Sequence, residues 1–232
     1  MLIDWVAALA PIADKKGWVW GLDGKFRPLA YTQTYNTPWL HTQTSIAGMK
    51  EASLDCGVLT IMHNHVFNKK AVHSFCMECY KVVVVLETLE QVHQMADWQQ
   101  TACVDNEWPC KVGAERRPYT QRVWGAYFYC RGVEEGRERY KAVRAWVDEN
   151  LGKDIKVFLK RACTEFEQHL GDSDKWEKIP RQDEIEAEGR EVIAFEPSLL
   201  GQSKIIQHHV WDTWNEWDKD NQSPVTYHET EE

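Results

Sequence analysis

The most regular hydrophobic pattern lies in the middle of the chain. The β-branched run KVVVVL at 81–86 has the length of a strand, and the apolar residues after it recur at helical spacing. KVGAERR at 111–117 and the aromatic run RVWGAYFYC at 122–130 predict a hairpin, with PYTQ in the turn. A second helical stripe then ends before Gly152, a residue that suits the end of a helix, and IKVFLKR at 155–161 predicts another strand.

These elements follow one another in the order β-α-β-β-α-β. This order predicts an α+β fold with a ferredoxin-like split βαβ core, in which two helices cover one face of a four-stranded antiparallel sheet. We expect N- and C-terminal additions to this core. The chain is therefore divided into an N-terminal extension (1–74), the core (75–171), and an acidic loop with a C-terminal strand and helix (172–232), which together form one structural unit.

The flanking segments carry weaker patterns. WVWG at 18–21 and GVLTIMHNHVF at 57–67 are typical of strands that either extend the sheet or form a flanking lobe. Residues 171–191 predict a linker or long surface loop, and REVIAFEP at 190–197 predicts a last strand. A stripe of apolar residues predicts a helix from about Ser198 onward: Ile206, Val210, Trp214 and Trp217.

The histidines of the second strand-like segment are a candidate metal pair. His63 and His65 alternate in sequence, so they would share one face of a strand, and such a pair can bind one metal ion. Half-buried structural histidines are the favoured interpretation.

Composition and charge restrict the class of protein. With 43% hydrophobic and 27% charged residues, the chain is typical of a globular protein rather than a fibrous or disordered one. No apolar run approaches the ~18 residues of a membrane span, and Asp4 and Pro11 interrupt the start where a signal peptide needs an apolar stretch. We therefore expect a cytoplasmic protein that does not bind membranes.

The net charge of −9 is unevenly distributed. Residues 111–161 carry 13 basic and 7 acidic side chains, a net charge of +6, whereas residues 162–232 carry 6 basic and 18 acidic ones, a net charge of −12. The basic segment is a candidate site for an unknown anionic partner or substrate. The favoured interpretation is that the acidic end of the chain compensates its charge.

The cysteines are the strongest chemical signal. Seven cysteines, an odd number, in a chain without an export signal argue against a disulfide framework. Cys76 and Cys79 form a C-x-x-C pair, for which metal ligation is favoured over a redox dithiol or two free thiols. In the predicted topology, six cysteines fall at the same end of the sheet: Cys76, Cys79, Cys103, Cys110, Cys130 and Cys163.

The irregular spacing of the cysteines favours an iron-sulfur cluster, most simply 4Fe-4S, over zinc. A four-thiolate zinc site usually contains a second C-x-x-C pair, which is missing. Cys110, like Cys79, stands at the entrance of a Lys-Val strand, and Cys56 precedes a flexible glycine. We therefore predict that Cys56, Cys76, Cys79 and Cys110 hold a cluster with a redox, catalytic or structural role. The alternatives to complete the site are Cys103, Cys130 and Cys163.

Two other functions fit the same residues. The first is a zinc-stabilised module that binds nucleic acid or another protein through arginines: Arg116, Arg117, Arg122, Arg131 and Arg137. The second is a cysteine-dependent enzyme centred on Cys163, with Glu165 or Glu167 as the acid-base partner. Lys160 and Arg161 would then supply positive charge to the sulfur.

Overall fold

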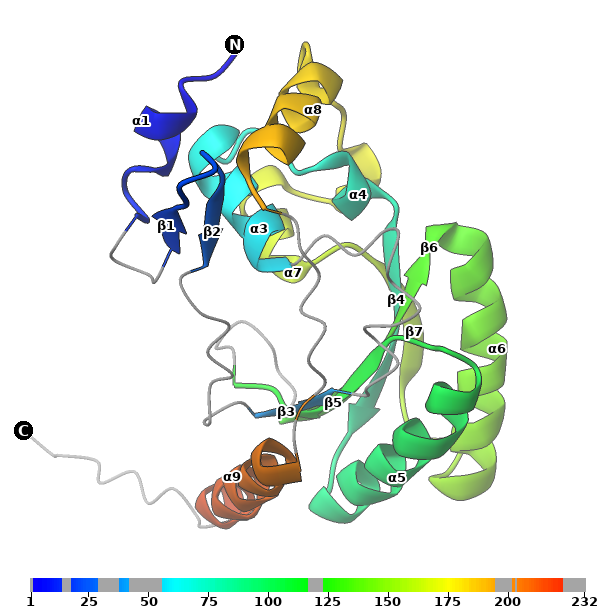
Figure 1. Ribbon diagram of the computed structural model, residues 1–232. Helices are drawn as coiled ribbons and strands as arrows, with labels where there is room; N and C mark the ends of the chain where they lie inside the picture. Colours follow the sequence, from blue (N-terminus) through cyan, green and yellow to red (C-terminus); the bar gives the residue numbers. More distant parts are fainter. Residues whose placement is uncertain are drawn as a thin grey trace, which may run out of the picture.

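The computed structural model describes residues 2–13, 18–28, 38–41, 56–116, 123–194, 202 and 204–222. Within these ranges the chain forms a mixed α and β fold with two antiparallel sheets (Figure 1). The small sheet pairs β1 (Trp18–Trp20) with β2 (Phe26–Pro28). The large sheet has five strands in the order β3-β5-β6-β4-β7, and each neighbouring pair is antiparallel.

The four strands expected in the middle of the chain are confirmed. The large sheet consists of β3 (Trp39–His41), β4 (Cys79–Leu86), β5 (Cys110–Ala114), β6 (Trp124–Arg131) and β7 (Val157–Arg161). The β-branched run of β4 pairs with both β6 and β7, and Val82, Val83 and Val84 are fully buried, as a central strand requires. The sheet is more complex than expected because β3 adds a fifth strand beside β5. Residues 117–122 of the predicted hairpin lie outside the described part.

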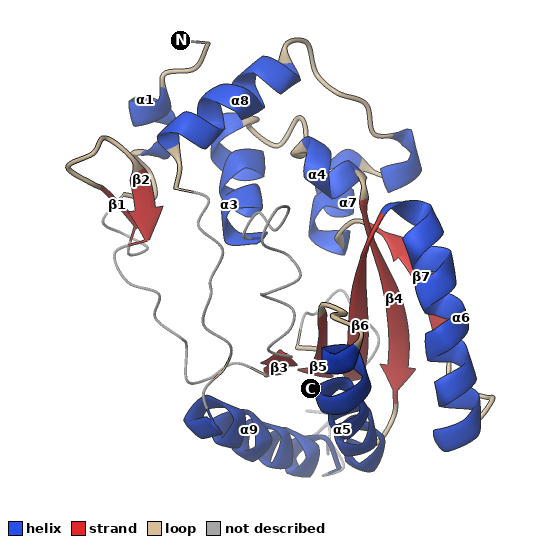
Figure 2. Ribbon diagram, turned by 45° about the vertical axis from the view of Figure 1, so that its right-hand side comes forward, coloured by secondary structure: helices blue, strands red, loops and turns tan. Residues whose placement is uncertain are grey.

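Helices cover one face of this sheet. Figures 1 and 2 show α5 (Leu89–Asp105) and α6 (Gly132–Asn150) along that face, with α9 (Lys204–Gln222) near β3 and β5. Their apolar faces and alternate residues of the strands form the largest hydrophobic cluster, which includes Val84, Val143 and Trp214. The helical stripes therefore predicted these helices correctly. None of the helices in the described residues has the length and hydropathy needed to cross a membrane.

A second group of helices gathers near the end of the sheet where β4 begins (Figure 1). It comprises α1 (Trp5–Leu9), α3 (Cys56–Ile61), the π-helix η1 (Met62–Val66), α4 (Ser74–Met77), α7 (Thr164–Leu170), the 3-10 helix η2 (Ser173–Lys175) and α8 (Gln182–Val192). Trp5, Phe26 and Ile185 belong to one hydrophobic cluster, so the N-terminal segment packs against α8 from the other end of the sequence.

Three predictions for the flanking segments are wrong. Residues 57–67 are mainly helical, because a short apolar run fits a buried helix as well as a strand. The predicted loop at 171–191 contains η2 and most of α8, whose Ile185 and Gly189 are buried one turn apart. The predicted last strand is the end of α8, followed by a single bridge between Ile193 and Phe26. Residues 195–197 of that prediction lie outside the described residues.

Candidate functional site

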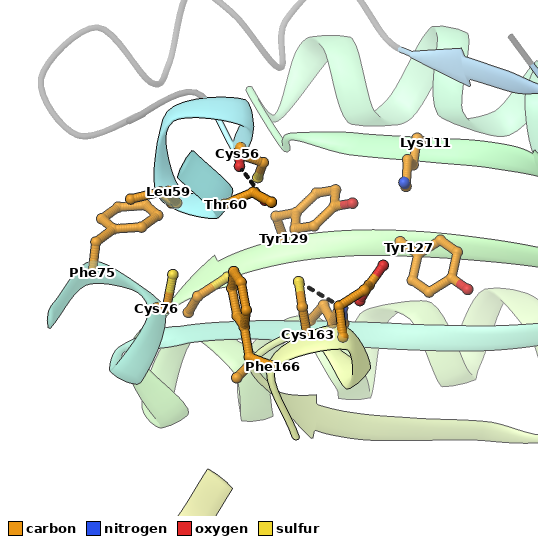
Figure 3. A pocket seen from close by; sticks show the side chains of 14 residues that line it. Cys56, Leu59, Thr60, Phe75, Cys76, Lys111, Tyr127, Tyr129, Cys163 and Phe166 are labelled. Atoms are coloured by element: carbon orange, nitrogen blue, oxygen red, sulfur yellow. Dashed lines mark hydrogen bonds between the residues drawn. The ribbon is translucent and has the colours of Figure 1, made fainter. Parts of the chain in front are cut away.

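A cavity of about 180 Å³ lies on the face of the large sheet opposite α5 and α6 (Figure 3). Four cysteines line it: Cys56, Cys76, Cys79 and Cys163. They come from α3, α4, the start of β4 and the residue before α7, so three separate chain segments contribute sulfur atoms. The volume far exceeds the ~10–15 Å³ needed for one water molecule, so the cavity has room for a small ligand or a metal cluster.

The alternation of strand residues decides which side chains reach the cavity. In β4, Cys79 and Lys81 line the cavity. The alternate residues Tyr80 and Val82 point to the other face and pack in the helix-covered core. On the neighbouring strands, Tyr129 is opposite Lys81, and Lys111 is opposite Tyr127. The sheet therefore presents amines, aromatic rings and a thiol on one face.

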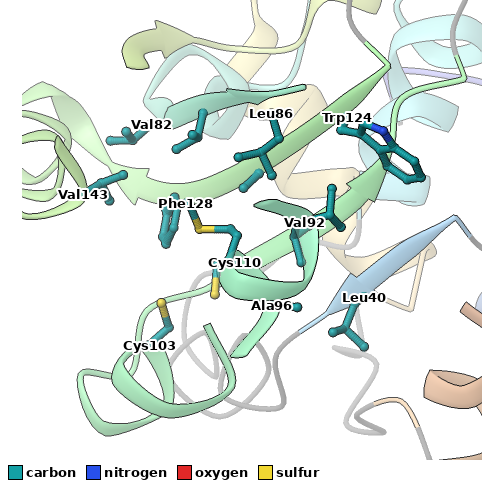
Figure 4. Packing of buried hydrophobic residues seen from close by; sticks show 14 of the residues in the cluster. Leu40, Val82, Leu86, Val92, Ala96, Cys103, Cys110, Trp124, Phe128 and Val143 are labelled. Carbon is teal, nitrogen blue, oxygen red and sulfur yellow. The ribbon is translucent and has the colours of Figure 1, made fainter. Parts of the chain in front are cut away.

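Cys110 lies on the other face of the sheet. Its neighbour Lys111 lines the cavity, so Cys110, one residue earlier, points into the helix-covered core. Figure 4 shows Cys110 near Cys103 of α5 in that core. A hydrogen bond with Cys110, together with burial, raises the pKa of Cys103 far above its ordinary value. The structure thus brings Cys56, Cys76 and Cys79 together and leaves the fourth predicted ligand apart.

Cys163, one of the alternatives for the fourth ligand, lies in the cavity instead. Cys130 and Cys103 belong to the helix-covered core with Cys110. All seven cysteines are in the described part of the chain, and all are free thiols. The six cysteines therefore divide between the two faces of the sheet: Cys76, Cys79 and Cys163 line the cavity, and the other three lie in the helix-covered core.

The C-x-x-C turn is held from two sides. His73 precedes α4, and its Nδ1 accepts a hydrogen bond of 3.1 Å from the Phe75 N–H, which caps the helix. Arg161, at the end of β7, donates through Nε to the Met77 carbonyl at 2.6 Å and through Nη1 to the Ser173 carbonyl at 2.7 Å. The guanidinium thus fixes the backbone between Cys76 and Cys79 rather than contacting the Cys163 sulfur.

Lys81 supplies the positive charge that contacts Cys163. Its side chain is only 5% exposed, and its Nζ donates a hydrogen bond of 3.5 Å to Cys163 Sγ. Burial opposes the charged form, but the nearby Cys163, Cys79 and Glu165 raise the pKa of Lys81, so the ammonium form persists. Sequence analysis did not select Lys81 because a single lysine within a run of valines has no motif around it.

The charged residues predicted beside Cys163 have other partners. Lys160 forms an ion pair with Glu167, and both side chains lie at the edge of α7 and β7. Glu165, in contrast, lines the cavity together with Cys163. Of the two predicted acid-base residues, Glu165 therefore lies at the cavity and Glu167 does not. The positive charge beside Cys163 comes from Lys81 rather than from Lys160 or Arg161.

Burial controls the protonation of the other thiols. It raises the pKa of Cys79 to about 12, and it raises the pKa of Cys76 further above the ordinary value, with Cys163 and Cys79 contributing. Both side chains are therefore thiols at neutral pH in the absence of a bound metal. Metal binding would release their protons.

The predicted histidine pair does not lie on a strand. His63 belongs to η1 and is buried, with Nδ1 2.8 Å from the Ala71 carbonyl and its ring 4.8 Å from that of Phe166. His65, two residues later, is partly exposed. The contacts of His63 support the structural interpretation.

The arginines of the basic segment have separate local contacts. Arg137 pairs with Glu134 of the same helix, and the guanidinium of Arg116 lies 5.0 Å from the centre of the Trp217 ring. Arg117 and Arg122 lie outside the described residues.

Within the described ranges, no three His, Cys, Asp or Glu side chains are arranged to hold a single metal ion. Comparison of the chain with models of known protein families, with curated proteins and with solved structures found no match. The functional conclusions below therefore depend on the cavity and its residues.

Proposed function

We propose that this protein binds an iron-sulfur cluster, most simply 4Fe-4S, through Cys56, Cys76, Cys79 and Cys163. The observation that carries the proposal is that these four thiols line one cavity although they come from three separate segments. Relative to the ligand set predicted from the sequence, Cys163 takes the place of Cys110.

The chemistry of the cavity supports a cluster. In a 4Fe-4S cluster each thiolate binds a different iron, so the four sulfurs need not converge on one point. A single tetrahedral zinc ion would require sulfurs about 3.8 Å apart, given Zn–S bonds of about 2.3 Å. Phe75, Tyr129 and Phe166 line the same cavity and limit the access of water, a factor that tunes the potential of such centres.

The buried ammonium of Lys81 supports the same proposal. Four thiolates would place negative charge in a partly closed site. A buried charge without a compensating partner destabilises the folded protein by several kcal/mol. Lys81 Nζ donates to the sulfur of Cys163, and hydrogen bonds to cluster sulfurs are a recognised influence on reduction potential. With cysteine on every iron, no coordination position is left for a substrate, so we propose electron transfer or fold stabilisation as the role of the centre.

We further infer that β4, α5, β5, β6, α6 and β7 form a ferredoxin-like unit. The antiparallel order β5-β6-β4-β7 and the position of both helices on one face support this assignment. This architecture alone carries no function. We also propose a cytoplasmic location, because seven free thiols are typical of a reducing compartment.

The test is the metal content of the purified chain. Anaerobically prepared protein is expected to be brown, with broad absorbance near 400 nm and roughly four irons and four sulfides per chain. Cys76→Ser, Cys79→Ser and Cys163→Ser should each lower the iron content strongly. The matched control is Cys110→Ser, a buried cysteine on the other face of the sheet, which should retain iron. A colourless protein with stoichiometric zinc would overturn the proposal and favour the zinc-stabilised interaction module.

A cysteine-dependent enzyme centred on Cys163 is the second candidate. The specific observation is the contact between Cys163 Sγ and the buried Lys81 ammonium, which stabilises negative charge on the sulfur. Glu165 lines the same cavity and is the acid-base partner in this proposal. Such an enzyme would need no metal, so retention of activity after chelation would separate it from the cluster proposal.

A further inference from the structure

Lys81 has hydrogen-bonding capacity that the cavity does not use. An ammonium group has three N–H donors. In the part of the chain that the structure describes, Nζ makes one hydrogen bond, to the weak acceptor Cys163 Sγ at 3.5 Å, and lies 5.7 Å from the centre of the Tyr127 ring. A buried ammonium with so few partners costs free energy unless an anion or another strong acceptor approaches it.

The surroundings of Lys81 restrict which anion fits. Among the described residues, the charged side chains that line the cavity, thiols aside, are Lys81, Lys111 and Glu165. The Glu165 carboxylate repels a dianion more strongly than a monoanion, so the cavity favours a ligand with a single negative charge. The aromatic side chains of Tyr129 and Phe166 lie on either side of the cavity in Figure 3 and offer apolar surface to the rest of the ligand.

We propose that this cavity binds a small carboxylate with an apolar body, its carboxylate group at Lys81 and its body against Tyr129 and Phe166. The carboxylate binds directly to the Lys81 ammonium, so its binding requires no metal. This site goes beyond the proposed function and is expected in the chain that holds no cluster, because a bound cluster would fill the same cavity and use the same Lys81 ammonium. Because Cys163 Sγ lies 3.5 Å from Lys81 Nζ, a carboxylate bound there also covers the thiol.

Benzoate is the probe, and benzyl alcohol is its uncharged counterpart of similar shape. Calorimetric titration of the full chain should show benzoate binding at least ~10-fold more tightly than benzyl alcohol, because a hydrogen bond to a charged group contributes that much discrimination. Lys81→Met, an unbranched uncharged substitution of similar length, should remove this difference. Phenyl phosphate, the dianionic probe, should bind more weakly than benzoate.

A second measurement uses the unmodified chain and so does not depend on the folding of a variant. Benzoate should slow the alkylation of Cys163 by N-ethylmaleimide, followed by mass spectrometry of its peptide, and benzyl alcohol should not. Equal binding of benzoate and benzyl alcohol, tighter binding of phenyl phosphate, or no protection of Cys163 would each overturn the inference.

The iron content of every preparation separates this inference from the proposed function. Benzoate binding to a chain that contains neither iron nor sulfide would support the carboxylate site and contradict the cluster. If the chain shows no preference for benzoate after its iron and sulfide have been removed, the carboxylate site is overturned, whatever the colour of the protein as purified.

Discussion

The Glu186 carboxylate of α8 accepts two hydrogen bonds from Ser74, one from the backbone N–H at 2.8 Å and one from the hydroxyl at 3.0 Å. Gln182 Nε2 donates to the same carboxylate oxygen at 2.7 Å and to the Val72 carbonyl at 2.8 Å. These bonds hold the first turn of α4, the helix that carries Cys76, although 112 residues separate Ser74 from Glu186. The acidic C-terminal segment therefore stabilises one wall of the cavity.

Glu186→Gln should destabilise the protein by about 1.5–3 kcal/mol, because hydrogen bonds that a buried carboxylate accepts are weakened when its charge is removed. Chemical denaturation followed by circular dichroism measures this change. The control is Glu184→Gln on the same helix, whose exposed pair with Arg181 should contribute less than about 1 kcal/mol. Cys76 should also react faster with thiol reagents in the Glu186 variant. Equal stability of the two variants would contradict the assigned role.

Acid should destabilise the fold as the pH falls below about 6.5. Burial is the main cause that lowers the pKa of His63 and of His73, both of which are 1% exposed. The unfolded chain therefore binds protons that the folded chain does not bind, so stability present above pH 6.5 is lost below it. Each histidine contributes up to about 1.4 kcal/mol per pH unit.

Denaturation curves between pH 7.5 and 5 measure this loss, and this window lies above the range in which most carboxylates titrate. His63→Gln should make the free energy of unfolding less dependent on pH, because one of the two buried histidines no longer contributes. A free energy of unfolding that stays constant from pH 7 to pH 5 would exclude the proposed linkage.

Gly113 and Gly125 are directly paired across β5 and β6, but only one of them should tolerate a methyl group. A Cβ atom on Gly113 would lie 1.9 Å from the backbone oxygen of Pro38, next to β3, whereas one on Gly125 would meet the Tyr127 ring at 3.4 Å. Gly113→Ala should therefore destabilise the protein by about 1–3 kcal/mol, because the backbone of β3 must move away. Gly125→Ala should be close to neutral. Thermal unfolding of both variants compares them, and a similar loss in each would show that β3 does not restrict Gly113.

When no metal is bound, Cys163 should react faster than the two thiols of the C-x-x-C pair, Cys76 and Cys79. Burial holds the pKa of Cys79 at about 12 and that of Cys76 higher still, whereas the Lys81 ammonium stabilises negative charge on the Cys163 sulfur. Lys81→Met should slow the alkylation of Cys163 several-fold, because it removes the positive charge that lies 3.5 Å from the sulfur. Lys160→Met is the control, because Lys160 pairs with Glu167 instead. If both variants react like the unmodified chain, Lys81 does not activate Cys163, and the enzyme proposal loses its supporting observation.

The local pattern of residues was sufficient to predict the elements that surround the site. The valine run of β4 and the aromatic run of β6 favour strands by composition and length, the stripes of α5 and α6 have helical periodicity, and the structure confirms all four elements. Their order also placed Cys76, Cys79 and Cys163 near one end of the sheet. The segment at 57–67 was ambiguous, because continuous apolar residues fit a buried helix and a strand equally well.

The elements of the large sheet and its covering helices could be predicted from composition, periodicity and chain order, and the same order indicated the end of the sheet at which the cysteines lie. Which thiols share a cavity could be read only from the three-dimensional fold. Cys110 and Lys111 are adjacent, yet they occupy opposite faces, and one step along a strand is enough to separate a thiol from the site. The roles of Lys81 and Glu186 also depend on partners 82 and 112 residues away. Such contacts are set by the packing of distant segments, which leaves no local pattern in the chain.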